Sequence, residues 1–82
     1  SDWFLPSKDE LNLMWLNLAD SDGDGYNAGP TDPNNIGGFA NNYYWSSSQY
    51  DSVSAWKQYF YYGNQFNDYK NNNYYIRAVR AF

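Results

Sequence analysis

Leucine is confined to the first eighteen residues, and this constrains the fold most, because the rest of the core has to be built from aromatic rings. The five leucines lie at positions 5, 11, 13, 16 and 18, whereas the chain contains ten Tyr, five Phe and four Trp. A buried Tyr or Trp needs a hydrogen-bond partner for its hydroxyl or indole N–H. With 82 residues, we expect a single domain (1–82) that buries about 60–65% of the surface of its unfolded chain.

The first predicted element is an amphipathic helix over residues 7–18. Ser7 and Glu10 form the S-x-x-E pattern of a capping box, in which each side chain accepts a hydrogen bond from the other residue's backbone. One stripe of apolar side chains then follows at helical spacing: Leu11, Met14, Trp15 and Leu18. We expect this stripe to pack into the core.

The remaining chain predicts a long loop followed by short strands. Residues 19–39 hold five of the six glycines and two of the three prolines, which no regular element would tolerate. Strands are predicted at 43–46, 53–62 and 74–81. We expect the last two to pair antiparallel, with 63–73 as a long connection. The predicted fold class is α+β: one N-terminal helix, a small antiparallel sheet and long irregular loops.

The loop contains a candidate calcium site. Its sequence from position 20 is D-S-D-G-D-G, the front half of a calcium-binding loop, in which alternate carboxylates converge on a hard cation. The twelfth position, where such loops carry an acid, is Thr31. The candidate ligands are Asp20, Asp22 and Asp24, with Asn27 or Asp32 completing an irregular site. The ion would be structural, and the alternative is a solvated, flexible acidic turn.

Residues 41–75 have the composition of a recognition surface. They contain nine Tyr, seven Asn, five Ser and two Asp. Tyr provides a large amphipathic contact area at low entropic cost, and Ser and Asn provide adaptable hydrogen bonds, as in antibody paratopes. The codons TAY, AGY and GAY for Tyr, Ser and Asp also each differ from the Asn codon AAY by the replacement of one adenine, as adenine-specific mutagenesis would leave them. The alternative is a Tyr- and Asn-rich surface of no special meaning.

Several ordered motifs carry a family resemblance. Residues 2–11 match the pattern W-x-L-P-[ST]-x-x-E-L, and later matches are Tyr44-Trp45-Ser46-Ser47-Ser48, Ala55-Trp56, the step from Phe60 to Gly63, Lys70 and Val79-Arg80. In these motifs the chain resembles Lcl-like domains, named for the C-terminal domain of the Legionella collagen-like adhesin. The resemblance covers nearly all of the chain except residues 19–36.

The resemblance implies a C-type-lectin-type fold similar to the variable proteins of diversity-generating retroelements, in which a mutagenised cassette displays ligand contacts on a fixed scaffold. It assigns framework roles to Trp45, Trp56, Phe60, Gly63, Ile76, Val79 and Arg80. The chain departs from the family pattern in two ways. It lacks the strands that usually precede the W-x-L-P motif, so we expect a domain truncated at its N-terminus whose terminal strand pairing is missing or supplied by another chain. The acidic loop is an insertion to which no family function carries over.

The predicted function is ligand binding or adhesion without catalysis, as in a phage receptor-binding protein or a bacterial surface protein. The expected contacts are Tyr50, Ser52, Ser54, Tyr59, Tyr61, Asn64, Asn67, Asp68, Tyr69, Asn71, Asn72, Asn73 and Tyr74. The expected partner is a protein or glycan on a cell surface, and the expected location is extracellular, at a cell surface or on a virion. The alternative is a fibre subunit that self-associates, as a homo-oligomer or with another chain, through the same surface.

Charge and composition argue against other classes. The net charge is −4, and the five basic residues are dispersed, which disfavours nucleic acid as a partner. No apolar run approaches the roughly 20 residues of a membrane span. The chain contains no His and no Cys, so acid–base catalysis would depend on carboxylates alone, and no pair of carboxylates stands out.

Overall fold

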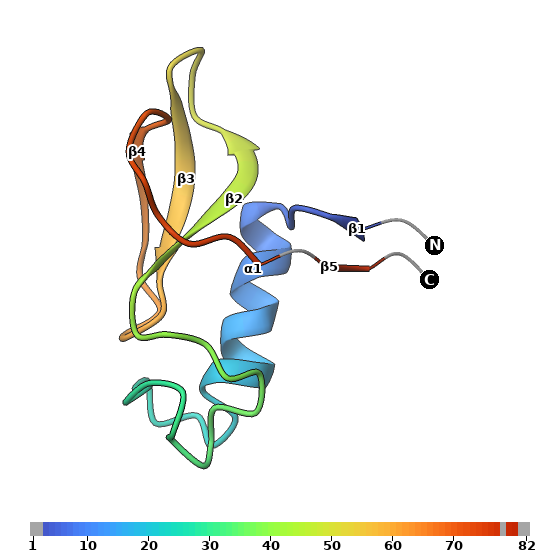
Figure 1. The fold of residues 1–82 in the computed structure, drawn as a ribbon, viewed down its shortest axis with the longest axis vertical. Coiled ribbons are helices and arrows are strands. Elements are labelled where there is room, and N and C mark those ends of the chain that lie inside the picture. Colours follow the sequence, from blue (N-terminus) through green and yellow to red (C-terminus); the bar gives the residue numbers. More distant parts are fainter. Residues whose placement is uncertain (1–2, 78, 81–82) are drawn as a thin grey trace.

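One helix packs against a three-stranded antiparallel sheet (Figure 1). The computed structural model describes residues 3–77 and 79–80. The helix α1 spans Lys8–Met14, and the sheet contains β2 (Tyr43–Gln49), β3 (Ser54–Tyr59) and β4 (Gln65–Tyr69) in the order β2-β3-β4. Two short strands, β1 (Trp3–Phe4) and β5 (Val79–Arg80), form a separate antiparallel pair. The predicted α+β fold class is confirmed.

The helix begins as the sequence predicts. The Glu10 backbone N–H donates to the Ser7 hydroxyl at 3.1 Å, and the Ser7 N–H donates to the Glu10 carboxylate at 2.8 Å. The capping box is therefore complete, and it satisfies backbone donors that the first helical turn leaves free.

The end of the helix differs from the prediction because its last turn is π-helical. The turn η1 spans Trp15–Ala19, and the Asp20 N–H donates to the Trp15 carbonyl at 2.8 Å, an i→i+5 bond. This wider turn rotates the following side chains relative to an α-helix. Ala19 is consequently buried, whereas Leu18, predicted to lie in the core, is 38% exposed.

The predicted pairing of residues 53–62 with 74–81 is wrong. β3 pairs instead with β4, which arises from residues predicted as a connection. The reason is a tight turn at Gly63, whose φ of +85° is accessible to glycine and whose N–H donates to the Tyr59 carbonyl at 2.6 Å. This turn returns the chain directly along β3.

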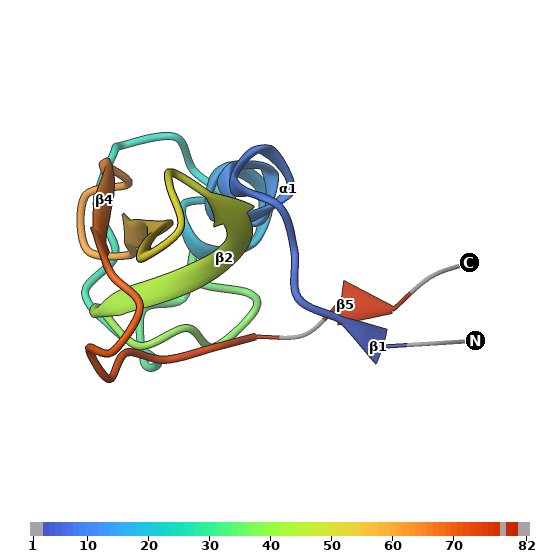
Figure 2. The same ribbon diagram turned by 90° about the horizontal axis from the view of Figure 1, so that it is seen from above.

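The C-terminal segment divides between two partners. Tyr75 forms an isolated parallel bridge to Tyr44 of β2, while Val79–Arg80 pairs with Trp3–Phe4. The chain thus makes one terminal strand pair of its own, between residues of the W-x-L-P motif and the Val79-Arg80 motif. Figure 2 shows β1 and β5 side by side, apart from the three-stranded sheet.

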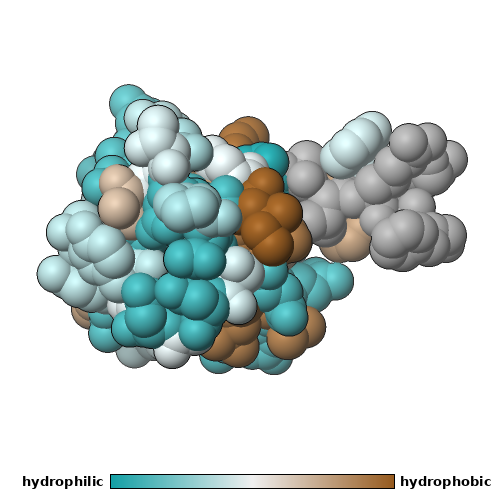
Figure 3. Space-filling model, turned by 90° about the horizontal axis from the view of Figure 1, so that it is seen from below, coloured by the Kyte–Doolittle hydropathy of each residue, from teal (hydrophilic) through white to brown (hydrophobic). Residues whose placement is uncertain are grey.

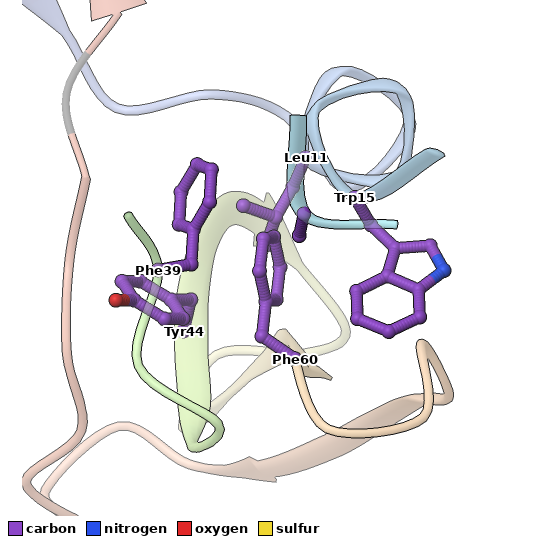
Figure 4. Packing of buried hydrophobic residues seen from close by; sticks show 6 residues of the cluster. Leu11, Trp15, Phe39, Tyr44 and Phe60 are labelled. Carbon is purple, nitrogen blue, oxygen red and sulfur yellow. The ribbon is translucent and has the colours of Figure 1, made fainter. Parts of the chain in front are cut away.

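The core is aromatic, as the distribution of leucine predicts. Phe60 lies at its centre, with ring centroids 4.7 Å from Phe39, 4.8 Å from Tyr44 and 5.7 Å from Trp15 (Figure 4). Leu11 closes the cluster from the helix. The Tyr44 hydroxyl accepts a hydrogen bond from the Ala40 N–H at 3.0 Å, which provides the partner that a buried tyrosine requires.

The predicted loop contains no helix or strand from residue 20 to residue 42 and is held by buried asparagines. The Asn27 amide donates to the Phe60 carbonyl at 2.8 Å, and the Asn35 amide donates to the Phe39 carbonyl at 2.7 Å. These side chains replace the backbone pairing that strands would supply. The loop forms the lower end of the molecule in Figure 1.

Candidate ligand-binding surface and acidic loop

The sheet has a helix-facing side and an outer side. Gln58 donates from its amide to Asn12 of the helix at 2.9 Å, and its cross-strand partner Tyr44 lies in the core. Because side chains alternate along a strand, their neighbours Lys57 and Tyr59 point to the outer side. This is the side on which the predicted recognition residues gather most densely.

Four tyrosines form a continuous layer on the outer side, which we call the outer tyrosine layer: Tyr43, Tyr59, Tyr61 and Tyr74. Tyr43 stacks on Tyr59 with centroids 4.5 Å apart and contacts Tyr74 at 5.2 Å. Tyr61 stacks on Tyr59 at 5.9 Å and extends the layer beyond the end of β3. All four rings are half-buried, so each packs on its neighbours and still reaches solvent.

A buried cation lies beneath this layer. The Lys57 ammonium is 4.0 Å from the centroid of the Tyr43 ring and 4.3 Å from that of Tyr74, and it pairs with the Asp68 carboxylate at 2.7 Å. Burial alone would lower the pKa of Lys57, but hydrogen bonds with Asp68 and Tyr74 outweigh it and raise the pKa. The Lys57 and Tyr74 hydrogen bonds hold the pKa of Asp68 well below its usual range. The network fixes the tyrosine rings in place.

The predicted contacts do not all lie on this side. Asn72 donates to Asp68 at 2.9 Å and lies with the outer tyrosine layer, whereas Asn67 and Tyr69 pair across to Trp56 and Ser54 and point to the helix-facing side. The others that reach solvent from the surrounding turns and the segment after β4 are Tyr50, Ser52, Asn64, Asn71 and Asn73.

Two of the predicted ligand contacts are used within the fold. Ser54 is only 6% exposed. It is the first residue of β3, directly after the turn of the β2–β3 hairpin, and its N–H donates to the Asp51 carboxylate at 2.8 Å. The prediction of Ser54 as a surface contact is therefore wrong. Asp68 is half-buried and has both carboxylate oxygens engaged within the protein.

A hollow of about 570 Å³ lies at the other end of the sheet, by the hairpin tip. Its lining residues are Ser52, Val53, Tyr69, Lys70 and Asn71. Three of these were predicted as contacts from composition, and the hollow brings them together from two segments of the chain.

Sequence reasoning missed aromatic members of the outer side, among them Tyr43 and Phe66. Tyr43 joins Tyr59 and Tyr74 into one layer, and the alternation of Tyr43 with the buried Tyr44 would have placed it there. Phe66, 45% exposed, lies 6.4 Å from Tyr43. It was missed because its segment was interpreted as a connection rather than a strand.

The acidic loop brings together three of its five predicted ligands. One carboxylate oxygen each from Asp20, Asp22 and Asp24 lies within 4.8 Å of the others. The Asp20 carboxylate raises the pKa of Asp24 above its usual value, as burial and the nearby charges also do. Figure 3 shows that hydrophilic residues cover most of this end of the molecule, with separate hydrophobic patches at its margin.

The other two predicted ligands are used elsewhere. Asn27 is fully buried, and its side-chain oxygen accepts from the Gly29 N–H at 2.9 Å. Asp32 accepts from the Ala28 and Asn34 N–H groups at 3.1 and 3.0 Å, and these bonds lower its pKa. Both side chains organise the loop backbone, and neither belongs to the carboxylate cluster.

Fold and surface together define a small α+β domain that presents an aromatic and amide-rich sheet face to solvent. The sequence model of the Lcl C-terminal domain matches residues 1–80, so the chain belongs to the Lcl C-terminal domain family, as its motifs suggest. The domain is associated with adhesins, which suggests a surface-exposed protein and is compatible with an adhesion role. No curated protein matches the chain. Within residues 3–77 and 79–80, no helix has the length and apolar character needed to cross a membrane.

Proposed function

We propose that this domain is a non-enzymatic binding module that attaches to a protein or glycan on a cell surface through the outer tyrosine layer. The observation that carries the proposal is the stacking of Tyr59 on both Tyr43 and Tyr61, with every ring still reaching solvent. Tyrosine rings held in this way offer stacking surfaces and hydroxyls at little entropic cost on binding. Asn72, which donates to Asp68 at 2.9 Å, adds an exposed amide beside them.

The hydroxyl groups at one end of the layer form a cluster of their own. The ring centroids of Tyr26 and Tyr62 lie 5.1 and 4.4 Å from that of Tyr61. The Tyr26 hydroxyl raises the pKa of Tyr61, and Tyr61 raises that of Tyr62. The hydroxyls of Tyr61 and Tyr62 can each donate and accept hydrogen bonds with a ligand.

Binding to panels of bacterial and host cells, measured by flow cytometry, tests this proposal. We expect Tyr59→Ser and Tyr61→Ser to lower apparent affinity by about tenfold or more, since aromatic anchors dominate such interfaces. The matched control is Tyr69→Ser, which removes a 63% exposed tyrosine from the opposite side of the sheet. Protease and glycosidase treatment of the cells separates a protein ligand from a glycan. Equal losses in all three variants, or binding by none of the cells, would contradict the proposal.

We further infer that the scaffold is of the C-type-lectin type and that the surface has been diversified by adenine mutagenesis. The resemblance to Lcl-like domains supports the scaffold. The codon relation among Asn, Tyr, Ser and Asp supports the diversification, as does the concentration of these residues in 41–75. The source genome provides the test. A near-identical repeat that differs only at adenines, beside a reverse transcriptase gene, is the expected finding, and a repeat with other substitutions would oppose it.

The alternative function is self-association into a fibre on a cell or virion surface. The sequence predicts it through the Tyr- and Asn-rich surface, and the observation that favours self-association concerns other, aliphatic residues. Leu13 and Leu16 on the helix are 58% and 51% exposed, and Ile76 is 66% exposed. Exposed aliphatic residues of this size provide apolar area for contacts between copies. Sedimentation velocity between about 10 μM and 1 mM distinguishes the two functions: a monomer throughout this range is expected of the binding module and would rule out the fibre subunit.

A further inference from the structure

The acidic loop contains a buried oxygen atom with no partner. Asp20 is 3% exposed, and its Oδ2 accepts from the Gly25 N–H at 2.9 Å. Its Oδ1 has no hydrogen-bond partner in the part of the chain that the structure describes. A buried carboxylate oxygen without a partner is unfavourable, and two more carboxylates beside it add repulsion. A bound cation would remove both costs.

We propose that this loop binds a calcium ion through the carboxylates of Asp20, Asp22 and Asp24. Calcium is a hard cation that takes six to eight oxygen ligands in flexible geometry, and carboxylates at alternate positions suit it. The backbone is already shaped for this arrangement, because Gly23 and Gly25 adopt φ values of +73° and +76° that favour glycine.

The ligand set also predicts the strength and selectivity of the site. Three carboxylates supply the charge, but the twelfth position of the loop is Thr31 rather than a bidentate acid. Water and backbone carbonyls would complete the coordination. We therefore expect a dissociation constant of about 10⁻⁴–10⁻³ M, the range of extracellular calcium modules. Magnesium should bind more weakly, because it demands near-ideal octahedral geometry and loses its water reluctantly.

Calcium binding would act on the recognition surface through Tyr26. The Tyr26 N–H donates to the Asp24 carboxylate at 2.9 Å, and its ring meets Tyr61 edge-on at 5.1 Å. The next residue, Asn27, donates from its backbone to the Tyr61 carbonyl at 2.9 Å. A cation that orders the loop would therefore hold Tyr26 against the outer tyrosine layer. This second step rests on the proposed function, whereas the calcium site does not.

Thermal unfolding of the intact domain with calcium chloride tests the site. At 10 mM calcium and a dissociation constant of about 1 mM, the unfolding equilibrium constant falls about 11-fold, which raises Tm by about 5–10 °C. Magnesium chloride at the same concentration should raise it by less than half as much. No shift at 10 mM calcium would overturn the proposal.

Matched Asp→Asn variants separate a specific site from general attraction to an acidic protein. Asp24→Asn keeps the oxygen that accepts from Tyr26 but removes one charge from the cluster, and Asp9→Asn removes one charge from the exposed first turn of the helix. We expect Asp24→Asn to lose the calcium shift and Asp9→Asn to keep it. If Asp24→Asn does not fold, Asp22→Asn serves the same purpose. Equal calcium shifts in wild type and cluster variants would overturn the site.

Two further readouts strengthen the test. Without calcium, Asp24→Asn should be at least as stable as wild type, because it relieves repulsion, and with 10 mM calcium the order should reverse. Hydrogen exchange at residues 20–29 should slow in calcium in the wild type only. Both readouts are independent of any ligand on the outer tyrosine layer, so loss of cell binding and loss of the calcium site can be distinguished.

Discussion

Replacing Gly63 with alanine should destabilise the domain by about 2–5 kcal/mol. The backbone conformation at this position is unfavourable for any residue with a Cβ, and the new methyl group would also clash with a neighbouring side chain. Gly63 has φ +85°, where a side chain costs about 1–2 kcal/mol. Its added Cβ would lie 2.3 Å from Nε1 and 2.5 Å from Cε2 of Trp15, more than 1 Å inside ordinary contact at 3.5–4.0 Å.

The clash cannot be relieved by a simple movement of the indole. Trp15 is 4% exposed and packs edge-on against Phe60 with ring centroids 5.7 Å apart. Overpacking of this kind costs about 1–3 kcal/mol, which with the backbone term gives the total. A domain of this size has about 4–12 kcal/mol of stability in all, so the loss is a large part of it.

Gly38→Ala is the matched control. Gly38 also has a positive φ, +66°, but its added Cβ would meet nothing within 4 Å. The difference between the two variants therefore isolates the contact with Trp15. Guanidinium unfolding followed by tryptophan fluorescence measures the free energy of unfolding of both variants. In a thermal melt, each kcal/mol of difference between them would lower Tm by about 4–8 °C. If Gly63→Ala is no less stable than Gly38→Ala, the close packing of Trp15 against this turn is contradicted. Adding Trp15→Phe to the Gly63→Ala background should recover part of the loss.

Three further predictions test the helix cap, the loop anchor and the buried ion pair. Ser7→Ala should cost about 1 kcal/mol in denaturant unfolding because the capping box is lost, with the exposed Ser52→Ala as a control that changes little. Asn27→Ala should cost about 1–3 kcal/mol for each buried carbonyl left without its amide donor, and an unchanged unfolding midpoint would contradict this anchoring. The pKa of Asp68 is lowered from its usual 3.8, so its contribution is full above about pH 4 and is lost as the pH falls below that value. Asp68→Asn should therefore flatten the acid limb of the stability curve and leave Lys57 without its ion partner at neutral pH; an unaltered acid limb would refute this assignment.

Elements controlled by neighbouring residues could be predicted from the sequence, and those controlled by distant contacts could not. The start of the helix depends on Ser7 and Glu10, three residues apart, so its pattern is visible in the sequence. Trp15 and Ala19, at the two ends of the π-helical turn, belong to the same buried cluster as Phe60 and Phe39, which lie in other parts of the chain. A 3.6-residue period therefore misplaced Leu18.

The same distinction applies to the sheet and the candidate sites. Pairing of β3 with β4 follows from the Gly63 turn, yet the Tyr- and Asn-rich composition around it has no clear alternation. The carboxylates of Asp20, Asp22 and Asp24 converge because they alternate along one short loop. Asn27 lies only three residues after Asp24, but its amide donates to the backbone carbonyls of Phe39 and Phe60, which lie far away in the sequence. No local pattern in the sequence indicates these hydrogen bonds.

The pairing of β1 with β5 determines how the domain would respond to a pulling force. A load applied to the two ends of the chain reaches the Trp3–Arg80 pair first and the Phe4–Val79 pair second. The hydrogen bonds between the two strands would therefore break one after another instead of sharing the load. Further along the N-terminal segment, among the residues that the structure describes, the Ser47 N–H donates to the Pro6 carbonyl at 2.8 Å and ties this segment to the sheet. Under such a load the two terminal strands would therefore separate before the helix, the core and the outer tyrosine layer are reached.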